Sequence, residues 1–209
     1  MEIDSRTLSP QAAYKLITGV VVPRPIAWVT TLGPEGTVNL APFSAFTFVS
    51  TRPPMIGINV GRKAGVRKDT ANNIHEHKEF VVNIADETMI EHVHLSAIEH
   101  APDVSEVDEL GLAVAPSSAV RTPRLVDAPV SLECRLHRVV EFGDTGSEFI
   151  VGEILVWRIR DGLVQDGKID TLKLRPIARI AGPRYAKLGD IIDLAPIAQT
   201  GKTVMERKR

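Results

Sequence analysis

The chain has 209 residues, of which 44% are hydrophobic and 24% are charged, and its formal net charge is −1. This composition is ordinary for a globular protein, and the length allows one large domain or two small ones. Because there is no overall positive charge, the composition argues against a general nucleic-acid binder and against a protein held on an anionic membrane. The single cysteine, Cys134, excludes an internal disulfide and a cysteine zinc cluster.

The sequence predicts a cytoplasmic protein. A reducing compartment is consistent with one unpaired cysteine. No stretch approaches the roughly 20 apolar residues of a membrane-spanning helix. The first ten residues are charged and lack the apolar centre of a secretory signal peptide.

The first predicted element is a short helix that begins at Ser9-Pro10, with Ser9 as the N-cap and Ala13, Leu16 and Ile17 as its apolar stripe. A β-hairpin follows, with strands over residues 25–32 and 37–50 and a turn over residues 33–36.

The second hairpin strand contains an unusual segment, Asn39–Ser44. Pro42 has no N–H and is not expected inside a central strand ladder. We therefore expect a β-bulge across this segment, with freed backbone groups that face something other than a neighbouring strand.

The remaining pattern predicts further strands and two more helices. A helix over residues 65–78 is expected to be capped by Asp69 or Thr70 and to bury Ile74, and residues 101–109 are expected to be a solvated acidic loop. The other expected elements are strands at 54–61, 79–85, 130–142, 148–159 and 177–180, a helix at 86–98 that buries Met89, Ile90, Val93 and Ile98, and a frayed end at 203–209. Because the strands come in hairpins, they favour an α+β fold that is mainly β, an antiparallel barrel with helices packed outside.

One candidate binding cluster spans residues 39–47. A bulged strand can turn backbone N–H and C=O groups toward the edge of a heteroaromatic ring, and Asn39, Ser44 and Thr47 add polar side chains. Apolar surface for a planar ligand comes from Phe43, Phe46 and Phe48. A purely structural bulge at a barrel corner is the alternative.

The second candidate cluster spans Gly61–Thr70, which follows a strand and opens a helix. It contains the cations Arg62, Lys63, Arg67 and Lys68. A helix N-terminus beside such cations is suited to an anion, and Lys68 and Thr70 are the best phosphate ligands. The carboxylate of Asp69 would repel a phosphate, so it fits better as the N-cap. The alternative is a solvated basic loop. Taken together, the two clusters match a phosphorylated planar cofactor, a description that suits flavin mononucleotide (FMN).

Several motifs in register resemble the flavin reductase-like, FMN-binding split-barrel family, which includes flavoredoxin-type proteins. The resemblance covers roughly residues 14–185. It is carried by residues Pro23–Thr31, Gly36, Asn39–Ser44, Pro53-Pro54, Lys68–Thr70, Asn73-Ile74 and Glu79–Asn83.

The resemblance implies an antiparallel six-stranded split β-barrel with peripheral helices. The sequence shows no internal repeat and no linker, so we expect a single domain over residues 1–209 with its core at about 10–187. The resemblance also implies a homodimer with FMN near the dimer interface, NADH or NADPH as reductant, and a protein or free flavin as a candidate electron acceptor. With the basic segment included, the expected cofactor-binding residues are Thr30, Thr31, Asn39, Ala41, Pro42, Phe43, Ser44, Arg62, Lys68, Asp69 and Thr70. Because the flavin carries the redox chemistry, we expect no catalytic acid or base and no metal site.

A late segment departs from the family pattern. Arg179, Gly182 and Tyr185 resemble a motif that usually carries two adjacent glycines, but Ala181 stands at the first glycine position.

The histidine pairs His75/His77 and His92/His94 are spaced two residues apart on predicted helices, so we expect surface or packing roles rather than metal ligation. Trp28 and Trp157 are expected in the core or in a dimer contact.

Three functions remain open at this stage. The first is an FMN-dependent flavin reductase that uses a nicotinamide donor. The second is a non-catalytic FMN electron carrier that serves a protein partner. The third, a split barrel that holds haem or no cofactor, is disfavoured by the phosphate-type loop. The sequence has no glycine-rich dinucleotide fingerprint, so a nicotinamide would bind transiently over the flavin.

Overall fold

The structure is a computed structural model of the chain, and it describes residues 1–195. The segment 203–209, expected to be frayed, lies outside the described residues.

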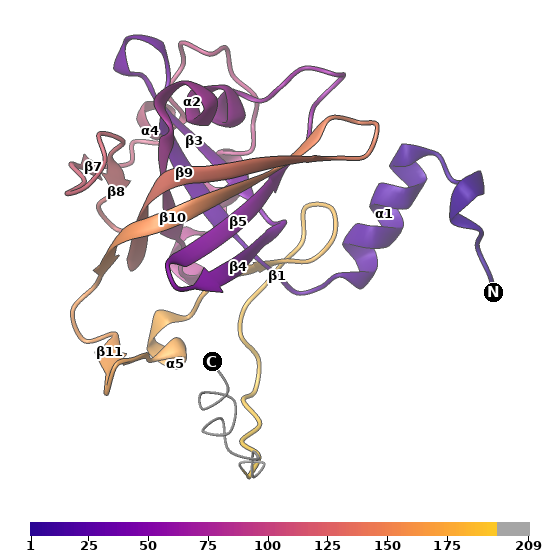
Figure 1. The fold of residues 1–209 in the computed structure, drawn as a ribbon. Helices are drawn as coiled ribbons and strands as arrows, with labels where there is room; N and C mark the ends of the chain where they lie inside the picture. Colours follow the sequence, from indigo (N-terminus) through magenta and orange to yellow (C-terminus); the bar gives the residue numbers. More distant parts are fainter. Residues whose placement is uncertain (196–209) are drawn as a thin grey trace, which may run out of the picture.

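A seven-stranded antiparallel sheet forms the body of the molecule (Figure 1), in the order β3-β2-β6-β9-β10-β5-β4. Its strands are β2 (Ala27–Leu32), β3 (Val38–Phe43), β4 (Phe46–Thr51), β5 (Pro54–Val60), β6 (Glu79–Ile84), β9 (Val130–Phe142) and β10 (Ser147–Ile159). The two outermost strands, β3 and β4, are consecutive in the chain, so the sheet curls back on itself. Between them the Ala45 carbonyl accepts a hydrogen bond from the Asn59 N–H on β5 at 2.8 Å. The expected split barrel is therefore confirmed, with seven strands in its sheet rather than six.

Short two-residue strands lie outside this sheet. β1 (Arg24–Pro25), β13 (Ala178–Arg179) and β14 (Tyr185–Ala186) form a three-stranded sheet, and β13 falls where a strand was predicted at 177–180. The other two pairs are β7 (Val114–Ala115) with β8 (Arg124–Leu125), and β11 (Val164–Gln165) with β12 (Lys168–Ile169).

The helices are short. They are α1 (Pro10–Val20), α2 (Asp69–His77), α3 (Ile90–Leu95), α4 (Glu106–Glu109) and α5 (Thr171–Leu174), with 3-10 turns at Ser5–Thr7, Pro34–Gly36 and Glu87–Met89. The Ser9 hydroxyl caps α1 as predicted, because it accepts a hydrogen bond from the Ala12 N–H at 3.2 Å. No residue of α1 is buried within this chain, and Figure 1 shows the helix standing away from the barrel.

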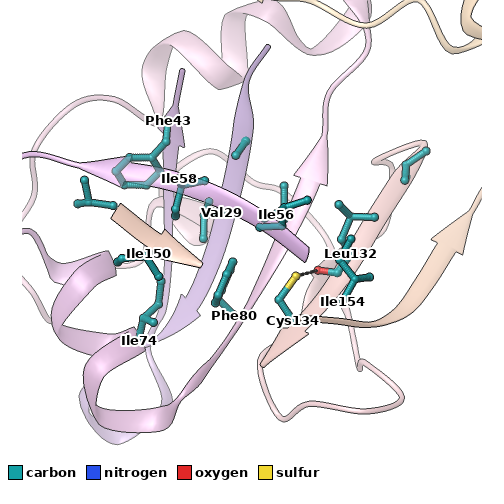
Figure 2. Packing of buried hydrophobic residues seen from close by; sticks show 14 of the residues in the cluster. Val29, Phe43, Ile56, Ile58, Ile74, Phe80, Leu132, Cys134, Ile150 and Ile154 are labelled. Atoms are coloured by element: carbon teal, nitrogen blue, oxygen red, sulfur yellow. Dashed lines mark hydrogen bonds between the residues drawn. The ribbon is translucent and has the colours of Figure 1, made fainter. Parts of the chain in front are cut away.

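Two apolar clusters hold the sheet together, and β2 contributes to both because its side chains alternate between faces. Ala27 and Val29 point into the larger cluster, with Ile58, Phe80 and Ile150 (Figure 2). Trp28 belongs to the smaller cluster, which includes Leu40, Met89 and Val93. Its indole N–H donates to the Ser96 hydroxyl at 2.8 Å, so burial of the ring leaves no polar atom unpaired. Trp28 is thus a core residue, as expected, whereas Trp157 is exposed in this chain.

The predicted bulge across Asn39–Ser44 is wrong. β3 pairs with β2 in unbroken register, from Ala27 opposite Phe43 to Leu32 opposite Val38. Pro42 is accommodated because β3 is an edge strand, where one side of the backbone needs no ladder partner. The predicted continuous strand is divided at Ser44-Ala45, between β3 and β4.

Two other expectations are corrected in the segment after β6. The helix predicted over 86–98 is a 3-10 turn followed by α3, which ends at Leu95. Met89 and Val93 are buried as expected. Ile98 is exposed, because it lies beyond the end of the helix. The acidic segment is not entirely a solvated loop. Its last part forms α4, and Glu106 is buried against β3.

Candidate functional site

A cavity of about 450 Å³ lies where β3, the start of α2 and the chain after α3 meet. β3 contributes Asn39, Ala41 and Pro42, and the start of α2 contributes Lys68, Asp69 and Thr70. The rest of the lining comes from Lys63, Ala64, Val66, Arg67, Ser96–His100, Pro102 and Glu106. Parts of the two clusters that the sequence singled out therefore share one cavity.

The β3 wall of this cavity is fixed by hydrogen bonds within the protein. The buried Asn39 amide donates to the Thr31 hydroxyl at 3.2 Å and to the Thr70 hydroxyl at 3.0 Å. These bonds tie β3 to β2 and to α2. On the free edge of β3, the Leu40 N–H donates to a carboxylate oxygen of Glu106 at 2.8 Å. The edge strand is thereby held in place by its neighbours on both sides.

Glu106 is a cavity residue that sequence reasoning missed. Burial raises the pKa of its carboxyl group, and the hydrogen bond from the Leu40 N–H partly offsets this effect. The short helix that carries it begins at Ser105, whose hydroxyl accepts from the Asp108 N–H at 3.3 Å. The Ser-x-x-Asp spacing from Ser105 to Asp108 is a helix-start signal that could have predicted α4.

The opposite wall is the N-terminus of α2, and here groups remain available. The helix begins at Asp69, and Lys68 at the N-cap position makes no side-chain capping bond. The expected cap by Asp69 or Thr70 is therefore wrong. The backbone N–H groups of Asp69 and Thr70 have no acceptor within residues 1–195, as is usual for a first helical turn. The Thr70 hydroxyl accepts from Asn39 and keeps its proton free to donate.

The cations around the cavity differ in whether they already pair with a carboxylate. Lys63 pairs with Glu99, and Arg67 pairs with the buried carboxylate of Glu148 at 2.8 Å. Lys68, in contrast, has no carboxylate partner in the described part of the chain; its ammonium nitrogen lies 5.7 Å from the centre of the Phe43 ring. Lys68 is thus the cavity-lining cation whose charge is left for a ligand.

Glu148 anchors the cations behind this wall. Arg67 and His75 each lie 2.8 Å from one of its carboxylate oxygens, and Arg62 lies 3.6 Å away. Burial opposes ionisation of this carboxyl group, but the bonds from His75 and Arg67 outweigh burial and hold its pKa below the usual value. The cluster fixes Arg67 at the cavity margin.

Five of the predicted site residues lie outside the cavity. Thr31 stands behind Asn39, and Thr30 is buried with its hydroxyl donating to the Pro123 carbonyl at 2.7 Å. The Phe43 side chain packs in the barrel core, as Figure 2 shows. Arg62 is not among the lining residues, and its guanidinium donates to the Gly146 and Gly65 carbonyls. Ser44 lines a neighbouring cavity.

The aromatic surface expected around the ligand is also distributed differently. Phe46 packs against the barrel core and Phe48 is exposed, and neither lines the cavity. Apolar lining comes instead from Ala41, Pro42 and the chain after α3.

The comparison with known families decides the classification. Residues 20–173 match the family model described as "Flavin reductase like domain". The chain belongs to the flavin reductase-like family. Its relatives include an uncharacterised protein of Halalkalibacterium halodurans, 43% identical over 93% of this chain and 95% of that protein.

Two solved structures share both fold and substantial sequence with this chain. Nitrilotriacetate monooxygenase component B from Bacillus cereus is 35% identical, with a TM-score of 0.90 over 93% of this chain and 98% of that one. The 2-nitrobenzoate 2-nitroreductase of Pseudomonas fluorescens is 33% identical, with a TM-score of 0.85 over 96% of this chain and 100% of that one. Flavoredoxin of Desulfovibrio vulgaris, at 22% identity and a TM-score of 0.74 over 93% of this chain and 96% of that one, shares the fold.

None of the helices within residues 1–195 combines the length and apolar character that a membrane crossing requires. Over the same residues, no group of three or more His, Cys, Asp or Glu side chains is arranged to hold a metal ion.

Proposed function

We propose that the chain is an FMN-dependent oxidoreductase of the flavin reductase class, and that the cavity between β3 and α2 holds the FMN. The observation that carries this proposal is the pairing of two features in one cavity. Lys68 supplies a positive charge for a phosphate, and the Asp69 and Thr70 amides, which have no acceptor within residues 1–195, supply N–H donors. The edge strand β3 supplies a rigid flat wall.

The residues present fit the phosphate end of this cofactor. Lys68 would contribute a positive charge, and the first turn of α2 would contribute backbone N–H donors. The Thr70 hydroxyl would contribute one more donor. Asp69 weakens the site, because its carboxylate lines the same cavity. Asn39, Ala41 and Pro42 would lie along the ring system, with Asn39 unable to rotate because both of its N–H donors are engaged. FMN, when bound, supplies the hydride and electron chemistry, so the protein's part is to bind, orient and limit water.

The proposed reductant is NADH or NADPH, bound transiently, and the proposed assembly is a homodimer. The dimer is supported by α1, which presents Tyr14, Leu16, Ile17 and Val20 to solvent within this chain. Apolar side chains at such spacing normally face a partner surface. The relatives named as a monooxygenase component and a nitroreductase favour an enzyme over a pure electron carrier.

The test is to identify the cofactor and then its reductant. Purified protein should release FMN, identified by mass, at about one per chain, or take it up from micromolar solution. Protein that takes up FAD but not FMN, or no flavin at all, would contradict the proposal. Under anaerobic conditions, NADH or NADPH should bleach the bound flavin rapidly. Slow bleaching by both nucleotides, with fast exchange from a reduced protein, would identify an electron carrier instead.

A further inference from the structure

A second cavity, of about 210 Å³, adjoins the proposed flavin site. The two cavities share Pro42 and Ala97 in their linings. Two arginines, Arg24 on β1 and Arg179 on β13, also line the second cavity, together with the Ser44 hydroxyl. A molecule held there would therefore lie against the same strand residue, Pro42, as the proposed flavin.

The two arginines face each other across a strand pair. β1 and β13 are antiparallel, and Arg24 is directly opposite Arg179 in their register. Directly opposed like charges destabilise a strand pair. Within residues 1–195 neither guanidinium forms an ion pair with a carboxylate; the contacts of Arg24 are to neutral oxygens. A bound anion would relieve this repulsion.

Arg24 is largely committed to the fold. Its guanidinium donates to the carbonyls of Thr18 at 2.6 Å and Val21 at 2.8 Å, to the Ser44 hydroxyl at 3.2 Å, and to the Ile180 carbonyl. These bonds tie the end of α1 to Ile180, the residue that follows β13. Arg24 therefore contributes a fixed positive charge to the cavity, with few donors left for a ligand.

Arg179 is oriented but mostly unsatisfied. Its guanidinium carbon stacks over the Tyr185 ring at 4.6 Å from the centroid, and one N–H donates to the Tyr185 hydroxyl. A guanidinium has five N–H donors in a planar fork, so most of them have no partner in the described part of the chain. Stacking on the tyrosine reduces the entropy that Arg179 loses when it binds a ligand.

We propose that this second cavity binds the carboxylate of a small organic acid, with Arg179 as its principal ligand and Arg24 as a supporting charge. A carboxylate matches the planar fork of Arg179 in a bidentate arrangement. Ile26 and Pro42 offer apolar contact for the rest of the molecule. The volume suits a compound of benzoate size and is too small for a whole nicotinamide dinucleotide. This inference rests on the proposed function, because it makes the cavity the binding site of an acidic compound beside FMN.

The test is a calorimetric titration of FMN-loaded protein with sodium benzoate and, separately, with benzamide, its neutral counterpart. We expect saturable benzoate binding and at least about tenfold weaker benzamide binding. Arg179→Gln should weaken benzoate about tenfold or more, the loss expected for a charge-assisted hydrogen bond. Arg179→Lys keeps the positive charge but loses the planar fork of donors. Its benzoate affinity should lie between those of the unmodified protein and Arg179→Gln. FMN affinity should stay within about twofold in both variants.

Arg138→Gln is the matched control, because Arg138 is an exposed arginine on β9 that lines neither cavity. It should bind benzoate like the unmodified protein. Undetectable benzoate binding, equal binding of benzamide, or unchanged affinity in both Arg179 variants would overturn the inference. So would NAD⁺ binding that depends on Arg179 while benzoate does not bind.

Failure of the proposed function remains distinguishable from failure of this inference. If the protein takes up no FMN, the same titrations are made on cofactor-free protein. Benzoate binding that depends on Arg179 would then support the carboxylate site by itself, and its absence would overturn it. If FMN binds and benzoate does not, only the carboxylate site is overturned.

Discussion

The two walls of the proposed flavin cavity differ in whether their polar groups are already paired within the protein. On the β3 wall, the polar groups are already paired within the protein: Asn39 with two hydroxyls, and the Leu40 N–H with Glu106. On the α2 wall, within residues 1–195, Lys68 has no carboxylate partner and the Asp69 and Thr70 amides have no acceptor. One wall therefore contributes rigidity, and the other contributes donors for a ligand.

Substitutions on the two walls should therefore affect different properties of the protein. Substitutions on the β3 wall that leave a buried group unpaired should lower the free energy of unfolding. Substitutions on the α2 wall should lower cofactor affinity and change stability little, because exposed charges without partners contribute little to the folded state.

The largest expected effect is that of Asn39→Ala. Losing both hydrogen bonds to the Thr31 and Thr70 hydroxyls should cost about 2 kcal/mol of stability, or about 6 °C in Tm for a chain of this size. Thermal unfolding followed by circular dichroism measures it. Asn72→Ala is the control, because Asn72 is an exposed asparagine on α2, the helix that also carries Thr70. Equal Tm values for the two variants would contradict the inference that the Asn39 hydrogen bonds hold the β3 wall in place.

Lys68→Met comes next. We expect FMN affinity to fall about 30-fold, within the range for a charge-assisted phosphate contact. Riboflavin affinity should change by less than about threefold, because riboflavin has no phosphate, and Tm should be unchanged. Quenching of flavin fluorescence measures both affinities. Lys168→Met, on the distant hairpin strand β12, is the matched control. An equal loss for both flavins would place the phosphate elsewhere.

Glu148→Gln should give a smaller, pH-dependent loss. The pKa of Glu148 is lowered in the folded protein, so its stabilising contribution is present above the unfolded value near 4.5 and is lost as pH falls through the folded value. We expect the variant to be about 1 kcal/mol less stable at pH 7, with the difference shrinking below pH 4.5. Denaturant titrations at several pH values test this. A difference that does not vary with pH would mean that ionised Glu148 is not the stabilising species.

Glu106→Gln should have the smallest effect and the opposite sign. Burial raises the pKa of Glu106, so its ionised form opposes folding as pH rises through the folded value. The variant keeps an oxygen acceptor for the Leu40 N–H and removes the buried charge. We expect it to be more stable at pH 7 by about 0.5 kcal/mol, and equal to the unmodified protein at pH 4. A clear loss of stability at pH 7 would contradict this sign.

The sequence predicted the fold better than the site. Strand alternation and the hairpin turns were sufficient for the barrel, because these signals are local. Pro42 was read as a bulge because its missing N–H excludes a central strand, and the sequence does not reveal that β3 lies at the edge. The burial of Glu106 could not be anticipated from an acidic segment, since it depends on one long-range bond to Leu40.

The same limit applies to the cations. Residues 61–70 read as one basic loop, yet the structure divides them: Arg62 and Arg67 are drawn to Glu148, far along the chain on β10, and Lys63 to Glu99. Only the fold shows which cation remains available. The register that opposes Arg24 and Arg179 is likewise a property of the assembled sheet.

A crystal structure of the FMN-loaded protein would show whether the cavity between β3 and α2 holds the cofactor. We expect the FMN phosphate within hydrogen-bonding distance of the Lys68 ammonium group and the Asp69 and Thr70 amides of α2, with the ring system along Asn39–Pro42. A flavin seated outside this cavity, or a phosphate with no contact to Lys68 or the start of α2, would contradict it.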